Sequence, residues 1–188
     1  MDPDTPASEA KVLWRAEHVP TAVLLATAPD GFKNAKPLNH TLVSGAATRY
    51  DGTDGLHLLL PGDHRLLLLE QNPNQPMAVV IPLDDDFLLR VAGALRFRRL
   101  LTEKDAGPPP RALRLTPRHR KRLIQMLRAL DGHLSDVTYR EIASVIFGAK
   151  VVRETGWKTL PVRAQTIRLV KDAITMMNRG YLQFLRGR

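Results

Sequence analysis

The C-terminal fold is decided by residues 138–178, which read TYREIASVIFG, AKVVRETGWKTL and PVRAQTIRLVKDAITMMN in that order. Thr138 is followed three residues later by Glu141, and this spacing is typical of a capping box at the start of a helix. Gly148 ends that helix, because glycine is the residue most often found just past a helix C-terminus. A second helix is predicted from Pro161, since proline is favoured in the first helical turn. Two helices in this order indicate a helix-turn-helix.

The segment between these two helices is too long for the standard form of this motif. A standard helix-turn-helix joins its helices with three or four residues, whereas residues 149–160 separate them here. A winged or extended-turn variant is therefore expected. Trp157 is predicted to anchor the long turn in the core, and Ile142, Val145 and Ile146 are predicted to be the buried side of the first helix.

The second helix has one apolar side and one polar side. Ile167, Val170, Ile174 and Met177 recur at helical spacing and are the predicted core stripe. Glutamine and arginine form bidentate hydrogen bonds with adenine and guanine edges in the major groove, and lysine and arginine bind phosphate. The predicted DNA contacts of this helix are Arg163, Gln165, Arg168 and Lys171. Residues 181–185 are expected to fold back as a short apolar tail.

A further helix is predicted upstream, from Thr116 as N-cap and Pro117 in the first turn to a left-handed cap at Asp131–Gly132. Its first turns carry consecutive basic residues, so some of them must point outward. Phosphate contact and a merely solvated face are both open for this run. The residues expected to contact phosphate are Arg118, Arg120, Lys121 and Arg122.

Charge is distributed unevenly along the chain. The net charge is +9, yet residues 111–188 hold 17 Lys and Arg against 5 Asp and Glu, whereas residues 1–110 hold 11 against 14. Solubility alone does not need charge concentrated in one half. The asymmetry therefore favours a polyanion-binding module joined to a mildly acidic domain.

The N-terminal half alternates short apolar runs with turn residues, which predicts strands. The predicted strands are residues 12–14, 22–27, 40–45, 56–60, 65–70 and 77–83, with a hairpin around residues 61–64. A helix follows at residues 87–101, where Leu88, Val91, Leu95 and Leu101 recur at helical spacing and Asp84–Asp86 are its electrostatic cap. The expected fold class is α+β: a strand-rich domain at 11–105, a proline-rich linker at 106–112 and an all-α domain at 113–188.

Several function classes find no support in the sequence. There is no cysteine, and His18, His40, His57 and His64 lack metal-ligand spacing. No nucleophile–base or phosphate-loop motif is present, so we expect neither an enzyme nor a cofactor. No apolar run approaches the roughly 20 residues of a membrane span, and the polar, acidic start is unlike a signal peptide, so a cytoplasmic protein without membrane contact is expected.

Residues 113–185 resemble the domain of unknown function 2285 family, which occurs in regulators of integrative and conjugative element transfer. The resemblance lies in RLTPRHRKRLIQMLRALDG, YREIASVIFG, GWK and TIRLVKDAITMMNRGYLQFL. It implies an extended-turn helix-turn-helix. Activators of this family bind DNA with a positively charged surface and dock a small N-terminal partner domain on the opposite side, whereas antiactivators carry an acidic surface and compete for that partner.

The balance of +12 over residues 111–188 is similar to the activator type. We therefore expect a DNA-binding transcriptional activator, or its DNA-binding subunit, that controls excision and transfer of a mobile conjugative element. Its expected partners are double-stranded promoter DNA, a small N-terminal activator domain on another chain, and RNA polymerase. The alternative is an antiactivator, a protein-interaction module that sequesters the activator's N-terminal domain.

Overall fold

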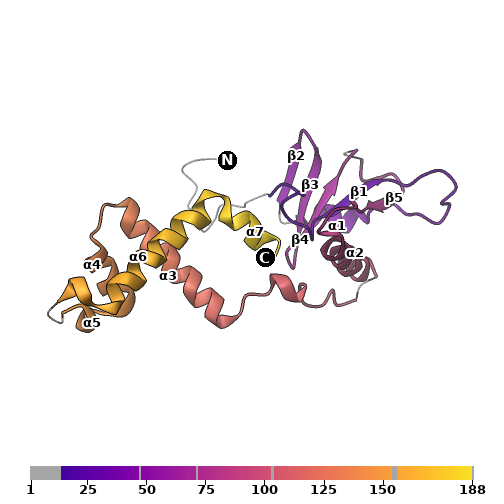
Figure 1. The fold of residues 1–188 in the computed structure, drawn as a ribbon. Coiled ribbons are helices and arrows are strands. Elements are labelled where there is room, and N and C mark those ends of the chain that lie inside the picture. The colour runs from indigo at the N-terminus through magenta and orange to yellow at the C-terminus, as the bar shows by residue number, and fades with distance from the viewer. Residues whose placement is uncertain (1–13, 47, 71, 103, 154–155, 188) are drawn as a thin grey trace. The chain divides into compact units, whose positions relative to one another are not determined.

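The computed structural model of the protein describes residues 14–46, 48–70, 72–102, 104–153 and 156–187. The chain forms two compact units, Met1–Ala112 and Leu113–Arg188. The first contains a five-stranded sheet and the second is helical, so the predicted α+β class is confirmed (Figure 1). Within the part of the chain that is described, no helix is both long and apolar enough to cross a membrane.

The sheet of the N-terminal unit has the strand order β2-β3-β4-β1-β5. Its strands are β1 Val23–Thr27, β2 Thr48–Gly52, β3 Gly55–Leu60, β4 His64–Leu68 and β5 Met77–Val80. β1 runs parallel to β4 and antiparallel to β5. The predicted hairpin is confirmed, because β3 and β4 pair antiparallel with Leu60 opposite His64.

Helix α2 (Phe87–Leu101) supplies an aromatic side chain to the core of this sheet. Phe97 is almost fully buried against the inward-facing leucines of β3 and β4. The helix approaches the backbone closely at Gly93, where a β-carbon would lie 2.8 Å from the Thr21 carbonyl oxygen. Glycine at this position therefore sets how near α2 can come to the residues that precede β1.

The predicted helix is confirmed as α2, but its buried side is not the one that carries Leu88 and Leu95. Leu88 is 79% exposed and Leu95 is 57% exposed, whereas Gly93 and Phe97 face inward. Arg90 is also buried, and its guanidinium donates from Nε and Nη2 to the Asp84 carboxylate at 3.0 and 2.7 Å. The inward side of α2 is therefore formed by Arg90, Gly93 and Phe97.

Two strand predictions for this unit are corrected. Residues 40–45 are not a strand, because His40–Ser44 forms helix α1, whose first turn is capped by the Asn39 side chain accepting from the Thr41 amide at 2.9 Å. The aspartates lie at the start of α2 as expected, with Asp86 in the N-cap position, although its side chain makes no capping hydrogen bond. Of the strand predicted at 12–14, residues 12 and 13 lie outside the described residues, and Trp14 is not in a strand.

A short 3-10 turn ends at the first residue of the helical unit, and five α-helices follow it. Their bounds are Arg111–Leu113 for the turn, then α3 Pro117–Leu134, α4 Tyr139–Phe147, α5 Ala149–Arg153, α6 Pro161–Thr175 and α7 Tyr181–Leu185. α3, α4 and α6 share one core. Its buried members are Met126, Ala129, Ile142, Leu169, Val170 and Ala173.

The features predicted around the turn are confirmed. The Thr138 hydroxyl accepts from the Glu141 amide, while the Glu141 carboxylate accepts from the Thr138 amide at 3.1 Å. α4 ends at Gly148, whose φ of 99° favours glycine. The long turn is filled by α5 and a 3-10 turn at Trp157–Thr159, and Trp157 packs against a buried cluster that includes Val152.

Three details of the helices differ from expectation. α3 runs on to Leu134 instead of ending at Gly132, where a β-carbon would meet Ile142 Cγ1 at 2.9 Å, so this glycine serves close packing of α3 on α4. Val145 is 72% exposed instead of buried. The buried stripe of α6 also differs, since it includes Thr166 and Leu169 while Met177 is exposed.

Candidate nucleic-acid interface

The basic run of α3 is exposed throughout. Thr116 caps the helix by accepting from the His119 amide at 3.2 Å, and Pro117 occupies its first turn. The four residues predicted to contact phosphate are all exposed: Arg118, Arg120, Lys121 and Arg122. Consecutive residues of a helix point in different directions around its axis, so these four side chains do not all lie on one side of α3.

The polar side of α6 is exposed as well. The four predicted contacts on this helix, Arg163, Gln165, Arg168 and Lys171, are all exposed. Gln165 and Arg168 are one turn apart, so they lie on neighbouring parts of the same side. The opposite side is buried, and its one hydroxyl is satisfied because Thr166 donates to the Val162 carbonyl oxygen at 2.8 Å.

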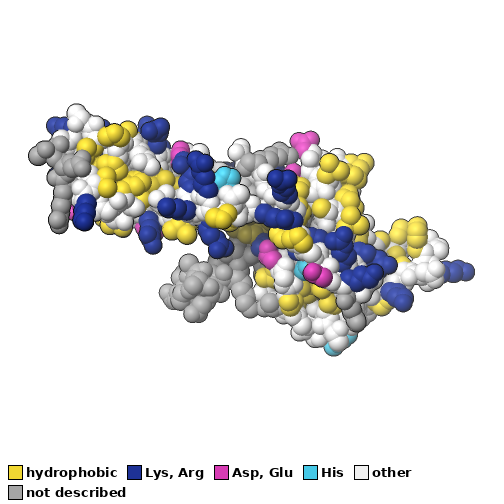
Figure 2. Space-filling model, turned by 90° about the horizontal axis from the view of Figure 1, so that it is seen from below, with side chains coloured by type: hydrophobic (Ala, Val, Ile, Leu, Met, Phe, Trp, Pro, Cys, Tyr) yellow, Lys and Arg dark blue, Asp and Glu magenta, His cyan; other side chains and the backbone are white. Residues whose placement is uncertain are grey.

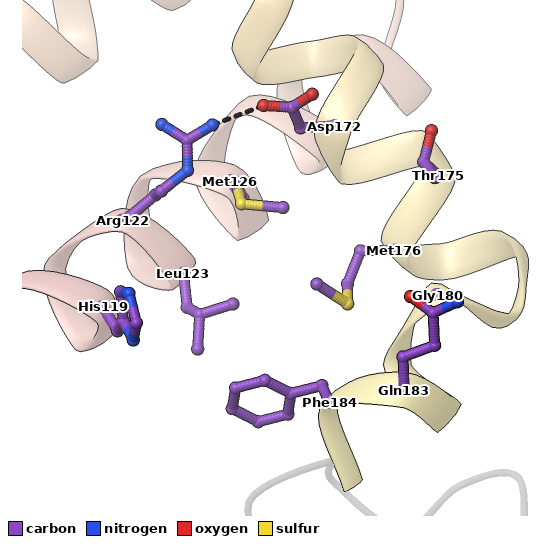
Figure 3. A pocket seen from close by; sticks show the side chains of 10 residues that line it. All are labelled: His119, Arg122, Leu123, Met126, Asp172, Thr175, Met176, Gly180, Gln183 and Phe184. Carbon is purple, nitrogen blue, oxygen red and sulfur yellow. Dashed lines mark hydrogen bonds and ion pairs between the residues drawn. The ribbon is translucent and has the colours of Figure 1, made fainter. Parts of the chain in front are cut away.

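An ion pair joins the two helices on this surface. The Arg122 guanidinium of α3 binds the Asp172 carboxylate of α6 (Figure 3). Beside the pair lies a cavity of about 360 Å³ with Leu123, Met126 and Phe184 in its lining. Phe184 belongs to α7, so the predicted apolar tail does fold back toward α3. The pair brings Arg122 of the α3 run to the polar side of α6, but the guanidinium of Arg122 is then occupied by Asp172.

Other members of the basic run face a different neighbour. Arg120 and Lys121 line a groove of about 340 Å³ together with Arg128 and with Ile146 near the end of α4. The run therefore wraps around α3 instead of forming one patch with α6. Arg128 was missed by sequence reasoning, although its position seven residues after Lys121 placed it on the same side of the helix.

Few acidic groups oppose this basic surface. The described acidic residues of the helical unit are Asp131, Asp136, Glu141 and Asp172. Within the capping box, the Glu141 carboxylate accepts hydrogen bonds from the Thr138 hydroxyl and amide, and these bonds lower its pKa. Figure 2 shows Lys and Arg side chains spread over the helical unit, with few Asp and Glu side chains beside them. Such a face attracts a polyanion.

The basic part of the chain begins earlier than the helical unit. Residues 1–86 hold 6 Lys and Arg against 12 Asp and Glu, whereas residues 87–188 hold 22 against 7. The change of sign thus falls at the start of α2, and the last turn of this helix carries the exposed Arg98 and Arg99. Arg96 of the same helix donates from Nε to the Gly107 carbonyl oxygen at 3.3 Å, which ties the proline-rich connector to α2.

An almost wholly apolar groove lies elsewhere on the helical unit. Leu127 and Leu130 of α3, with Met177 and Tyr181 beyond the end of α6, line about 340 Å³ of space. Leu127 is well exposed there. Within the described ranges, no three His, Asp or Glu side chains gather in a way that could hold a metal ion.

Comparison with known proteins agrees with the charge distribution. A search of curated proteins found no match. A family model described as "T6SS, Transcription factor, DNA binding domain" (RovC_DNA-bd) matches residues 80–186, which is more than half of the chain and begins just before α2. This match confirms the expected DNA-binding regulator domain. Its family name differs from that of the domain of unknown function 2285 family, which the sequence resembles. The chain belongs to this T6SS transcription-factor family and carries its DNA-binding domain.

Proposed function

We propose that the protein is a transcriptional activator that binds promoter DNA with the polar side of α6 and grips the phosphate backbone with the basic run of α3. The observation that carries this proposal is the exposed side of α6, where Gln165, Arg168 and Lys171 remain accessible while Arg122 reaches the same side from α3. An α-helix fits the major groove of B-DNA, so these side chains would meet base edges and flanking phosphates.

The roles of the two helices predict different mutational effects. Gln165 and Arg168 would make base contacts, and Lys121 would make phosphate contacts. Arg168→Ala should therefore lower discrimination between cognate and unrelated DNA, costing about 1–3 kcal/mol on the cognate site. Lys121→Ala should weaken binding to both sequences about equally and reduce the salt dependence. Fluorescence anisotropy on a footprinted promoter and on a scrambled duplex of equal length separates the two effects.

One outcome would contradict base readout by α6, and another would contradict the basic surface as the DNA site. If Arg168→Ala lowers affinity for both duplexes by the same factor, then α6 contacts only the backbone. If affinity hardly changes between about 50 and 200 mM salt, the basic surface is not the DNA site, because each phosphate contact contributes about 0.9 to the slope of log K against log salt.

The genes that the protein controls are a separate part of the proposal. The sequence resemblance points to genes for excision and transfer of an integrative and conjugative element, and the matching family is described as T6SS transcription factors. Sequencing genomic fragments that the purified full chain retains, together with reporter fusions to the recovered promoters, distinguishes these loci. Reporter activity that rises with the protein supports an activator, and activity that falls contradicts it.

A second function, docking of a protein partner, is favoured by the apolar groove at Leu127, Leu130, Met177 and Tyr181. The partner would be a small activator domain on another chain or a subunit of RNA polymerase, and an antiactivator would use such a groove without binding DNA. Leu127→Asp should abolish partner co-purification and leave DNA affinity unchanged. Charge reversal at Arg163 and Arg168 should abolish DNA binding and leave partner co-purification unchanged. A chain that shifts no DNA but keeps its partner after charge reversal is an antiactivator.

A further inference from the structure

The N-terminal unit contains a cavity of about 710 Å³ between the sheet edge and α2. Its apolar lining comes from β1, β5, α2 and the segment before α1, elements that lie together in Figure 1. Leu25, Leu38 and Phe97 are buried members of the core, and Met77 packs against them. The volume is within the range of small-molecule sites, about 300–1,000 Å³.

Hydrogen-bond donors stand around this apolar lining. Asn34 and Lys36 come from the segment that precedes α1, and Arg98 comes from α2. None of these three side chains makes a hydrogen bond or ion pair with another described residue, and no carboxylate is found among the described lining residues. Other polar groups of the lining are occupied: Asn39 caps α1, and the Thr102 hydroxyl donates to the Arg99 carbonyl oxygen at 3.0 Å.

We infer that this cavity binds a small amphipathic anion, with an apolar body on the exposed Val79 and Leu101 side chains of the lining and a carboxylate or sulfonate head between Lys36 and Arg98. Two cations without a described acidic partner favour a negatively charged head, since charge-assisted hydrogen bonds are the stronger kind. The Asn34 amide is available as a third donor. The neighbouring aliphatic surface favours a hydrocarbon or aromatic body over a bare inorganic ion.

This site is separate from the proposed DNA surface. None of its lining residues belongs to α3 or α6. α2 nevertheless lies inside the segment that matches the DNA-binding family, so a ligand here would touch both the strand-rich part and the matched part of the chain. The inference does not depend on DNA binding, and it can fail or hold by itself.

The test uses the full chain and the fluorescent anion 1-anilinonaphthalene-8-sulfonate. Its fluorescence should rise on binding, and decanoate should displace it at concentrations where inorganic phosphate does not. Lys36→Gln and Arg98→Gln should each weaken binding about tenfold, the typical loss of one charge-assisted contact. Arg49→Gln is the matched control, because Arg49 is an exposed cation of the same unit on β2, outside this cavity, and its loss should have no effect.

The probe also binds unspecific apolar surface, and the variants separate that case. Equal affinity for the unmodified protein, Lys36→Gln and Arg98→Gln would overturn the inference, because the bound anion would then lie elsewhere. Displacement by phosphate as effective as that by decanoate would overturn the amphipathic character of the ligand. Far-ultraviolet circular dichroism of each variant is the check that the substitution leaves the fold intact.

Discussion

Replacing Asp172 with asparagine should strengthen DNA binding. Asp172 is the only acidic residue of α6, and its carboxylate engages the guanidinium of Arg122. The substitution removes a negative charge from the surface that we propose faces DNA, while asparagine keeps a similar shape. It also releases Arg122, which is then available to bind a phosphate.

The magnitude follows from the exposure of the pair. The two side chains are 57% and 47% exposed, so loss of the ion pair should cost less than about 1 kcal/mol of folding stability. One additional phosphate contact steepens the slope of log K against log salt by about 0.9, and fourfold dilution of salt then raises affinity by a further factor of about three to four. The gain should therefore be several-fold at low salt and small at high salt.

Fluorescence anisotropy titrations at four salt concentrations measure the DNA affinity and the slope of log K against log salt. Asp131→Asn is the matched control, since it changes the net charge equally at an exposed acid of α3 that is not paired with Arg122. An equal gain from Asp131→Asn would mean that only net charge matters. Weaker binding by Asp172→Asn, with an unchanged slope, would refute the reasoning, because the pair would then be needed to orient Arg122 instead of withholding it.

Three further perturbations test the fold. Gly93→Ala should lower the free energy of unfolding in urea by about 1–3 kcal/mol, because the added carbon would meet the backbone of Thr21. Thr138→Ala should destabilise the helical unit by about 1 kcal/mol in thermal unfolding, since it removes the N-cap of α4. Burial and the nearby Arg96 charge lower the pKa of His64, so His64 binds a proton more readily in the unfolded chain than in the folded unit. The free energy of unfolding of the N-terminal unit should therefore fall as pH drops below about 6.5. His64→Gln should flatten this pH dependence in urea titrations.

Local chemistry made several elements predictable. The capping box at Thr138 and Glu141, the stop at Gly148 and the hairpin before His64 each depend on residues within a few positions of one another, so the sequence contains the whole cause. The segment 40–45 was mistaken for a strand because its apolar run is short. The segment instead forms a short helix whose first turn is capped by the Asn39 side chain.

The orientation of α2 could not be found in this way. Apolar residues occur on every side of that helix, so periodicity favoured Leu88 and Leu95, which the structure leaves exposed. The small size of Gly93 and the Arg90–Asp84 pair select the buried side, and both act through segments outside the helix. Periodicity has no information about such contacts.

The sequence by itself determined the two helices around the long turn, the basic character of residues 111–188 and the class of partner, because caps, turns and charge depend on residue type and near neighbours. Only the tertiary structure decided which charges meet. Arg122 and Asp172 are fifty residues apart in the chain, yet packing of α3 on α6 pairs them. Packing likewise turns Arg120 and Lys121 toward α4 and sets Lys36 and Arg98 around one cavity. The reason is that helix and sheet packing depends on the shapes of distant surfaces, which no local pattern records.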